Sequence, residues 1–322
     1  MLPIFASTLV TILPVFLIIA AGFGAGKAGL LGAGASRPLN RFVIWIALPC
    51  LMFDVVATTD WHAQWNPGFV VLSVLGSMLA FGLGLIVGRL RGLSIADMAV
   101  DGLNASYANS AYIGLPLLTL VLGPQCRPLV AIAATLTLVV LFTIAVLMIE
   151  LGRSHGHGIG RAAWHVLRGI LTNPVLMAPA LGLLWWMSGH SLPTPAERLV
   201  AMLGGAASPT ALVAIGLFLA ERPLTEAMTD RSVLSLATIK LAVHPAITAI
   251  LAWWVFSFPT SVNITAIMIA ALPTGTGPFM VAEFYARDGR VTSGSIFMST
   301  LLSVVVIAAV AAMLGVAPPG RG

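Results

Sequence analysis

Hydrophobic residues form long runs separated by short polar stretches along this 322-residue chain. About 20 consecutive apolar residues are enough for a helix to cross the hydrocarbon core of a bilayer. Windows of that length predict ten spanning helices, near residues 5–26, 38–57, 67–89, 97–122, 128–150, 170–188, 202–220, 232–256, 262–287 and 292–314. The pattern therefore predicts an all-α polytopic membrane protein.

Two of these runs, one in each half of the chain, are interrupted near their middle by glycine and proline. The interruptions lie at residues 109–116 (Asn-Ser-Ala-Tyr-Ile-Gly-Leu-Pro) and 272–279 (Leu-Pro-Thr-Gly-Thr-Gly-Pro-Phe). A break at membrane depth persists only where it is buried in protein or lines a wet cavity, because the freed backbone groups need partners. Paired breaks are typical of transporters, whose half-helix ends bind a small anion together with a coupling cation or proton.

Basic residues are distributed unequally between the two sides of the ten-helix arrangement. With the N-terminus outside, three of them lie outside: Arg127, Arg198 and Arg321. The cytoplasmic ones are Lys27, Arg37, Arg41, Arg89, Arg91, Arg153, Arg161, Arg168, Arg222, Arg231, Arg287 and Arg290. This bias satisfies the positive-inside rule and predicts that both termini are extracytoplasmic.

Five spans in each half imply that the two halves enter the membrane from opposite sides. Residues 1–150 and 170–322 are therefore expected to form two inverted five-helix repeats, with fourth and ninth helices that are both broken. Pro116 and Pro278, one in each break, are 162 positions apart, which agrees with this repeat. Residues 151–169 form a short basic connector on the cytoplasmic side.

Composition excludes several other classes of protein. Hydrophobic residues make up 59% of the chain and charged residues 8%, which rules out a soluble domain. The net charge of +5 comes from scattered basic residues, so no nucleic acid partner is expected. Cys50 and Cys126 lack metal-type spacing. His155, His157 and His165 lie in or beside the connector without a nearby carboxylate, which favours a solvated cluster over a metal site. We therefore expect no metal, no cofactor and no enzyme activity.

Three motifs carry a resemblance to a known family. They are residues 48–53 (Leu-Pro-Cys-Leu-Met-Phe), Asn-x-x-Tyr-x-Gly-x-Pro at 109–116, and Pro-Thr-Gly-Thr-Gly-Pro-Phe at 273–279, which continues to Ala282 and Tyr285. With these motifs the chain resembles the auxin efflux carrier family in its short bacterial form, which includes malate and malonate permeases. The resemblance covers nearly the whole length.

The resemblance implies a fold like that of the bile acid sodium symporters. Spans 1, 2, 6 and 7 would form a scaffold, and spans 3–5 and 8–10 a moving core in which the broken fourth and ninth spans cross. It also implies secondary transport of organic carboxylates across a bacterial inner membrane. The long loop of the plant carriers is missing, and Thr274 and Thr276 stand where those proteins repeat an asparagine. Auxin is therefore not the expected substrate.

The two breaks and one buried cation supply the candidate substrate site. Its expected residues are Asn109, Tyr112, Gly114, Pro116, Pro273, Thr274, Gly275, Thr276, Gly277 and Lys240. The amide of Asn109 can donate to a carboxylate, or it can cap the second half-helix. The hydroxyl of Tyr112 can bind substrate, or its ring can pack. The threonines and glycines of the second break can cradle an anion or act as a hinge.

Four ionisable residues in the apolar runs are candidates for function, because each costs roughly 2.5–3.5 kcal/mol to insert. Lys240 can neutralise a substrate carboxylate or an acidic partner. His244, one helical turn later, has an ordinary pKa near 6.5 and is a candidate proton carrier or a packed core residue. Glu283 and Asp101 can pair with Lys240 or carry a proton, and Asp101 can also be an interfacial charge.

We interpret these features as a secondary active transporter that moves a small organic anion, such as malonate or malate, by alternating access at the helix crossing. A sodium-coupled symporter, with Asn109 and the threonines among the cation ligands, is an alternative. A solute sensor that does not transport is another. The coupling ion, H⁺ or Na⁺, stays open. A homodimer can form through Gly204, Gly205 and Ala206, or these residues can pack within one chain.

Overall fold

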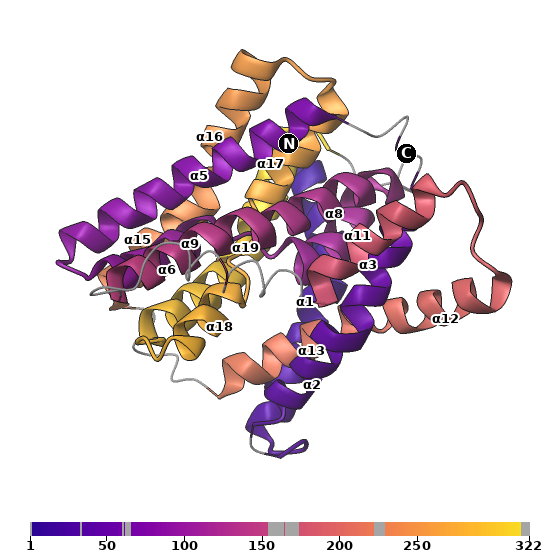
Figure 1. Cartoon of the computed structure of the whole chain (residues 1–322). Helices are drawn as coiled ribbons and strands as arrows, with labels where there is room; N and C mark the ends of the chain where they lie inside the picture. Colours follow the sequence, from indigo (N-terminus) through magenta and orange to yellow (C-terminus); the bar gives the residue numbers. More distant parts are fainter. Residues whose placement is uncertain are drawn as a thin grey trace.

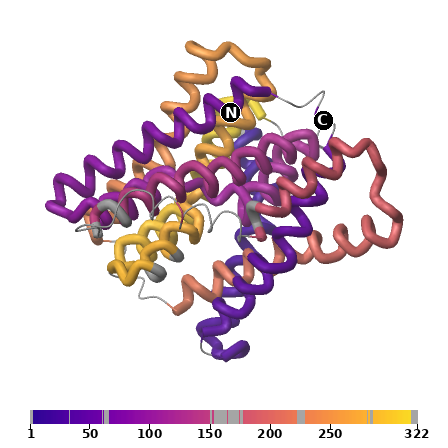
Figure 2. Tube along the Cα trace, viewed as in Figure 1, coloured from indigo at the N-terminus to yellow at the C-terminus, as the bar shows by residue number. Residues whose placement is uncertain are grey.

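The structure is a computed structural model that describes residues 2–32, 34–59, 61, 66–153, 164, 174–221 and 229–316 (Figures 1 and 2). In these residues every regular element is helical, and seven helices are long and apolar enough to cross a membrane. They are Pro3–Lys27, Ser36–Ala57, Pro67–Leu90, Pro124–Ile149, Thr194–Ala220, Arg231–Phe256 and Arg290–Met313. The histidine cluster and nearly all of the connector lie outside the described residues. The ten-helix inverted repeat stays a prediction.

The seven long helices match seven of the ten predicted runs. The fourth, sixth and ninth runs contain shorter helices instead. These are α6 (Ile95–Ser106) and α7 (Leu115–Leu122) in the fourth run, α11 (Pro174–Met187) in the sixth, and α17 (Thr260–Ala270) and α18 (Gly277–Phe284) in the ninth. The fourth and ninth runs are the two that contain the glycine and proline motifs.

Helices α1 (Leu2–Lys27) and α13 (Ala207–Ala220) are in direct backbone contact. A methyl group built on Gly216 would lie 2.1 Å from the carbonyl oxygen of Ile19, and one on Gly22 would lie 2.4 Å from that of Val213. Small residues at such contacts let two helices approach closely in a membrane, where packing rather than the hydrophobic effect holds helices together.

A second group of contacts surrounds the second predicted span, which runs through α2 (Ser36–Phe42), η1 (Val43–Ala47) and α3 (Leu48–Ala57). Helix α3 packs against α11 and α12 (Thr194–Gly205), and α2 packs against α13. Predicted span 1 therefore packs against span 7, and span 2 packs against span 6. The contacts of α2 with α13 and of α3 with α12 link these two pairs.

The remaining helices also pack with one another (Figure 1), and the last of them, α19, packs against α1 as well. Helix α5 (Pro67–Leu90) packs along α6, where a methyl group on Gly84 would lie 2.5 Å from the carbonyl oxygen of Asp101. Helix α9 packs against α6, α15 against α19, and α16 against both α5 and α17. This part of the chain includes η3 (Pro124–Cys126), α8 (Arg127–Leu136), η4 (Thr137–Leu141), α9 (Phe142–Arg153), α15 (Arg231–Thr238), α16 (His244–Ile250), η6 (Leu251–Phe256) and α19 (Arg290–Met313).

Proline explains three of the wide, π-helical turns in these helices. Proline lacks an N–H and its ring crowds the carbonyl four residues earlier, so the preceding turn cannot keep regular α-helical bonding. Each of these turns ends two residues before a proline: η1 before Pro49, η2 (Ser110–Gly114) before Pro116, and η5 (Ile239–Val243) before Pro245. Two of them carry residues of the candidate site, Tyr112 and Lys240.

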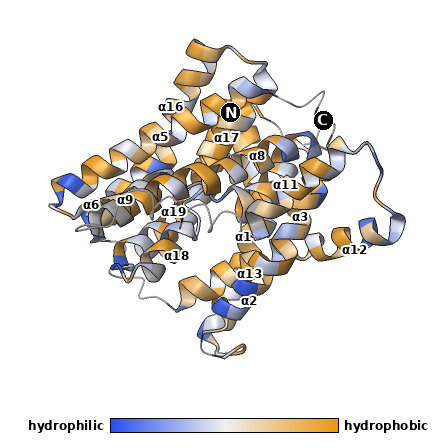
Figure 3. Ribbon diagram, viewed as in Figure 1, coloured by the Kyte–Doolittle hydropathy of each residue, from blue (hydrophilic) through white to orange (hydrophobic). Residues whose placement is uncertain are grey.

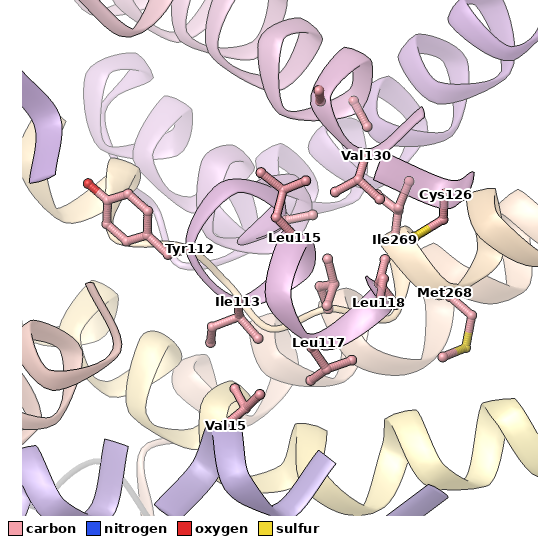
Figure 4. Close-up of a cluster of buried hydrophobic side chains, with 14 of the residues drawn as sticks. Val15, Tyr112, Ile113, Leu115, Leu117, Leu118, Cys126, Val130, Met268 and Ile269 are labelled. Atoms are coloured by element: carbon pink, nitrogen blue, oxygen red, sulfur yellow. The ribbon is translucent and has the colours of Figure 1, made fainter. Parts of the chain in front are cut away.

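Apolar side chains cover the outside of the helices as well as the interior. Hydrophobic residues follow most of the length of helices such as α5 and α16, and hydrophilic residues gather at helix ends and loops (Figure 3). Trp254, for example, is 85% exposed. Such an exterior fits a lipid environment. Inside, Leu115, Leu117 and Leu118 of α7 pack with Val130 in a buried cluster (Figure 4).

The small residues proposed for a dimer have different surroundings. A methyl group on Gly204 would lie 3.1 Å from the backbone of Leu51, so Gly204 serves packing between α12 and α3 of one chain. Gly205 has no neighbouring atom within 4 Å. On the same helix, Leu199 and Met202 are exposed. The homodimer stays a prediction.

Candidate functional site

The two glycine and proline motifs meet in space. The chain leaves helical conformation at residues 107–109, after α6, and again at residues 271–276, between α17 and α18. Ala108 and Thr274 form an antiparallel β-bridge. Two backbone bonds accompany it, from the N–H of Asn109 to the carbonyl of Pro273 (2.9 Å) and from the N–H of Gly275 to the carbonyl of Tyr107 (3.0 Å). Backbone groups in each break have lost their partners within a helix, and the other break supplies new hydrogen-bond partners for them.

A cavity of about 90 Å³ lies beside this bridge. At about 30 Å³ per water molecule in the liquid, this volume corresponds to roughly three water molecules. Asn109, Tyr112, Thr276 and Gly277, four of the predicted substrate residues, line it. Ile44 and Leu48, from η1 and α3, form another part of its wall. The cavity therefore lies where the two breaks face the second predicted span.

Two helices begin at this cavity. The continuous helix Ser110–Leu122, which comprises η2 and α7, begins directly after Asn109, and α18 begins at Gly277. The N–H groups of a first helical turn have no partner within the helix and carry partial positive charge, so they attract anions. Lining residues Ser110 and Thr276 lie at these two helix starts.

Asn109 lines the cavity, and its side chain does not cap a helix. Its backbone carbonyl accepts bonds from the N–H groups of Ile113 (3.2 Å) and Gly114 (2.8 Å), and its amide makes no capping bond. Of the two roles considered from the sequence, the capping role of the side chain is absent in the described structure. The amide is therefore available for a ligand in the cavity.

Tyr112 connects the first break to the second predicted span. Its hydroxyl donates to Oδ1 of Asn40 on α2 at 3.3 Å. In Figure 4 the hydroxyl points away from the apolar side chains of α7 that the view labels. The ring itself is 8% exposed, so Tyr112 combines a packed ring with a polar contact to a neighbouring helix.

The other predicted break residues shape the crossing and do not line the cavity. A methyl group on Gly114 would lie 2.6 Å from the side chain of Leu272, so this glycine allows the two breaks to approach. Pro116 stands in the first turn of α7. Pro273 and Gly275 provide the backbone bonds described above. Thr274 is fully buried, and its hydroxyl donates to the carbonyl of Asn104 at 2.9 Å.

Tyr107 is a site residue that sequence reasoning missed. Methyl groups on Gly275 and Gly277 would lie 2.7 and 2.5 Å from atoms of its ring, and the ring centroid is 5.8 Å from that of Phe142. Tyr107 also lines the cavity. Two glycines in alternate positions do signal a close neighbour, but the sequence pattern does not say which residue it is.

Lys240 and His244 lie together but not in the Asn109 cavity. The ammonium group of Lys240 donates to the carbonyl of Ala270 at 2.6 Å and lies 3.3 Å from Nδ1 of His244. Both side chains are buried. Ala270 is the last residue of α17, so the cation sits at the negative end of a helix dipole. A separate cavity of about 30 Å³ is lined by His244, Ala270 and Ser77. Lys240 is not among the residues that line the Asn109 cavity.

Of the two acidic candidates, the structure describes the side chain of Asp101 alone, and its ion-pair partner is an arginine. Asp101 forms a salt bridge with Arg91, and its side chain is 5% exposed. Glu283 belongs to α18, but its side chain lies outside the described part of the structure. A pair that sequence reasoning missed joins α6 to the residues after α18: the guanidinium of Arg287 binds both carboxylate oxygens of Asp97.

Comparison with known proteins agrees with this architecture. A family model described as "Membrane transport protein" matches residues 7–310. A protein of Rhizobium meliloti (strain 1021) described as "Putative malonate transporter" is 28% identical over 297 residues, with 92% of each chain covered. An "Uncharacterized transporter" of Methanothermobacter thermautotrophicus is 25% identical and covers 94% of this chain and 97% of its own.

A plant protein extends the comparison. "Auxin efflux carrier component 8" of Arabidopsis thaliana is 20% identical over 343 aligned positions, which cover 90% of this chain and 93% of its own. The resemblance to the auxin efflux carriers that the motifs indicate is therefore confirmed. With the family match over nearly the whole length and a multi-pass helical structure, this chain belongs to the membrane transport protein family.

Proposed function

We propose that this protein is a secondary active transporter that carries a small organic anion, with malonate or malate as the leading candidates. One observation carries the proposal. Two helix N-termini and the uncommitted amide of Asn109 meet at a single cavity between the crossing breaks. The helix N-termini and the amide carry only partial positive charge. They can therefore bind an anion without holding it so tightly that it cannot be released on the other side of the membrane.

The substrate class rests on the chemistry of the lining. Backbone N–H groups and the Asn109 amide can donate to carboxylate oxygens, and Thr276 adds a hydroxyl. The apolar side chains of Ile44 and Leu48 close the opposite wall and favour a short carbon chain between carboxylates. The description of the Rhizobium relative as a malonate transporter agrees with this assignment.

Lys240 would act on the anion from behind the second break. Its ammonium group neutralises the negative end of α17 at Ala270, so the potential near the crossing is more positive than the two helix halves alone would make it. We therefore retain Lys240 among the functional residues as an electrostatic support, without direct contact to the substrate.

Alternating access would come from movement of one packed group against the other. In this proposal the inverted five-helix repeats place spans 1, 2, 6 and 7 in a scaffold and the other spans in a moving core. The packing of α1 with α13 and of α3 with α11 and α12 supports the first group. The cavity wall from η1 and α3, and the bond from Tyr112 to Asn40, would break and re-form as the core moves.

Coupling and orientation are further parts of the proposal. His244, beside its own small cavity, is the leading proton candidate, with Glu283 and Asp101 as the others. Symport with sodium is the second form of the mechanism. We place the protein in a bacterial inner membrane with both termini outside, following the distribution of basic residues.

Uptake into proteoliposomes tests the proposal. Labelled malonate, malate, acetate and indole acetate are compared under imposed pH, sodium and potential gradients. Saturable uptake of a carboxylate is expected. Asn109→Ala and Lys240→Gln should each reduce it at least tenfold, about 1.4 kcal/mol of binding or barrier.

The control is Asn66→Ser, which changes an asparagine outside the cavity and keeps a good N-cap for α5. It should transport like the parent. A carboxylate that binds and raises the melting temperature, but is not taken up under any gradient, would replace the transporter with the sensor.

A further inference from the structure

A second polar cluster lies at the C-terminal end of α6, and none of its members lines the cavities described above. It contains Asn104 of α6, Thr274 of the second break, and Thr292, Ser295 and Ser299 of α19. Each of the five side chains is at most 1% exposed. Five fully buried polar residues from three segments need partners for every donor and acceptor, because an unpaired buried group costs about 1–3 kcal/mol.

Hydrogen bonds connect four of the five residues. The amide nitrogen of Asn104 donates to the hydroxyl of Thr292 at 3.0 Å. The hydroxyl of Thr274 donates to the backbone carbonyl of Asn104 at 2.9 Å, and the N–H of Thr274 donates to the hydroxyl of Ser299 at 3.0 Å. These bonds run from α6 to α19, from α19 to the second break, and back to α6.

Ser295 lies inside this ring but makes none of its bonds. It is three residues after Thr292 and four before Ser299, so the three side chains share one face of α19. The hydroxyl of Ser295 has no hydrogen-bond partner among the described residues, and neither does Oδ1 of Asn104. Two buried oxygens of this cluster, one on α6 and one on α19, therefore have no partner among the described residues, and a ligand that contacts both would satisfy them.

The chemistry of the ring restricts that ligand. Oδ1 of an asparagine is only an acceptor, so the ligand must be a cation or a hydrogen-bond donor. Every atom that the ring offers is a neutral oxygen, which suits a monovalent cation better than a calcium ion, whose sites are rich in carboxylates. The nearest acidic residue along α6, Asp101, is paired with Arg91 and also interacts with the side chain of Asn104.

The position at a helix end also favours a cation. Carbonyls at a helix C-terminus carry partial negative charge. At the end of α17 the ammonium group of Lys240 meets this charge at Ala270. At the end of α6 the carbonyl of Asn104 meets the hydroxyl of Thr274. The two broken helices therefore end in different surroundings, one with a fixed cation and one with a ring of oxygens.

We propose that a sodium ion binds in this ring, with Oδ1 of Asn104 and the hydroxyl of Ser295 as ligands. The ring holds Thr274, and the preceding carbonyl, of Pro273, accepts the N–H of Asn109 at the anion cavity. Sodium binding would thus order the second break and, through that bond, the first. The role of sodium in coupling rests on the proposed function, whereas the sodium site itself does not depend on it.

Thermal unfolding of the purified protein in equal concentrations of sodium, potassium and choline chloride tests the site. Sodium should raise the melting temperature in a saturable way, while potassium and choline should not. Ser295→Ala should abolish the sodium-dependent rise. In choline its melting temperature should be at least that of the parent, since the substitution removes an unpartnered hydroxyl.

The matched control is Ser303→Ala on the same helix. The hydroxyl of Ser303 already donates to the carbonyl of Thr300 at 2.7 Å, outside the ring, so the sodium-dependent rise should remain. Equal melting temperatures in all three salts would show that sodium does not bind specifically in the ring, and would overturn the proposal. A rise that persists in Ser295→Ala would do the same. The test needs no transport, so a protein that fails to take up carboxylates can still pass it.

Discussion

Replacing Gly277 with alanine should disturb the crossing of the two breaks through a single identifiable contact. The added methyl carbon would lie 2.5 Å from the outer ring carbon of Tyr107 and 2.9 Å from its hydroxyl oxygen. Carbon atoms in contact normally stay about 3.5–4.0 Å apart. Either the ring or the start of α18 must therefore move by about 1 Å.

The expected cost follows from the surroundings of the ring. Tyr107 packs against Phe142 and over Gly275 as well, so it has little room to retreat. Inserting one carbon into a packed site typically costs about 1–3 kcal/mol. At about 2–4 °C per kcal/mol, the melting temperature should fall by several degrees. Uptake of the carboxylate should also weaken, because Gly277 lines the anion cavity.

The assay is thermal unfolding of four proteins: the parent, Gly277→Ala, Tyr107→Leu and the double variant. Leucine lacks the outer ring atoms that the new methyl group would meet, so Gly277→Ala should cause no further loss in the Tyr107→Leu background. Gly24→Ala is the control, since no atom lies within 4 Å of its added carbon. A melting temperature of Gly277→Ala equal to that of Gly24→Ala, or the same loss in both backgrounds, would contradict the close contact between Gly277 and Tyr107.

Two further substitutions test the packing and the ion pair. Gly216→Ala would place a methyl carbon 2.1 Å from the carbonyl oxygen of Ile19, and because backbone cannot swing aside, it should lower the melting temperature more than Gly277→Ala does; an unchanged value would contradict the close contact of α1 and α13. Asp97→Arg should lower stability modestly, by about 0.2–1 kcal/mol for this partly exposed pair, and adding Arg287→Asp should restore it in low salt but less so in high salt.

The sequence predicted most of the helices because helix formation depends on local composition. Seven apolar runs became long helices. In the described structure the chain leaves helical conformation at residues 107–109 and 271–276, so the first interruption lies just before its glycine and proline motif, whose residues 110–116 are helical, and the second overlaps its motif. Proline and glycine act on their own backbone, so their effect can be read without knowing what lies nearby.

The contacts of the site could be predicted only in part. Asn109, Tyr112, Thr276 and Gly277 do share a cavity, as expected from two facing breaks. The partner of Lys240 and the role of Tyr107 could not be found in the same way. They depend on the rotation and depth of each helix, and a 20-residue hydropathy window determines neither. Asn104 belongs to this second class, because its partners Thr274 and Thr292 lie 170 and 188 residues away in the sequence.

The bridge between Ala108 and Thr274 also has a consequence for biosynthesis. These residues are 166 positions apart, so the backbone groups freed in the first break have no partner until the second break has been made. At a translation rate of ~5–20 residues per second, the backbone groups of the first break lack these hydrogen-bond partners for roughly 8–33 s. During that interval the first half must keep this segment near water, near the insertion machinery or in a temporary helical form. The first five predicted spans can therefore enter the membrane early, but they can complete their fold only when the second half arrives.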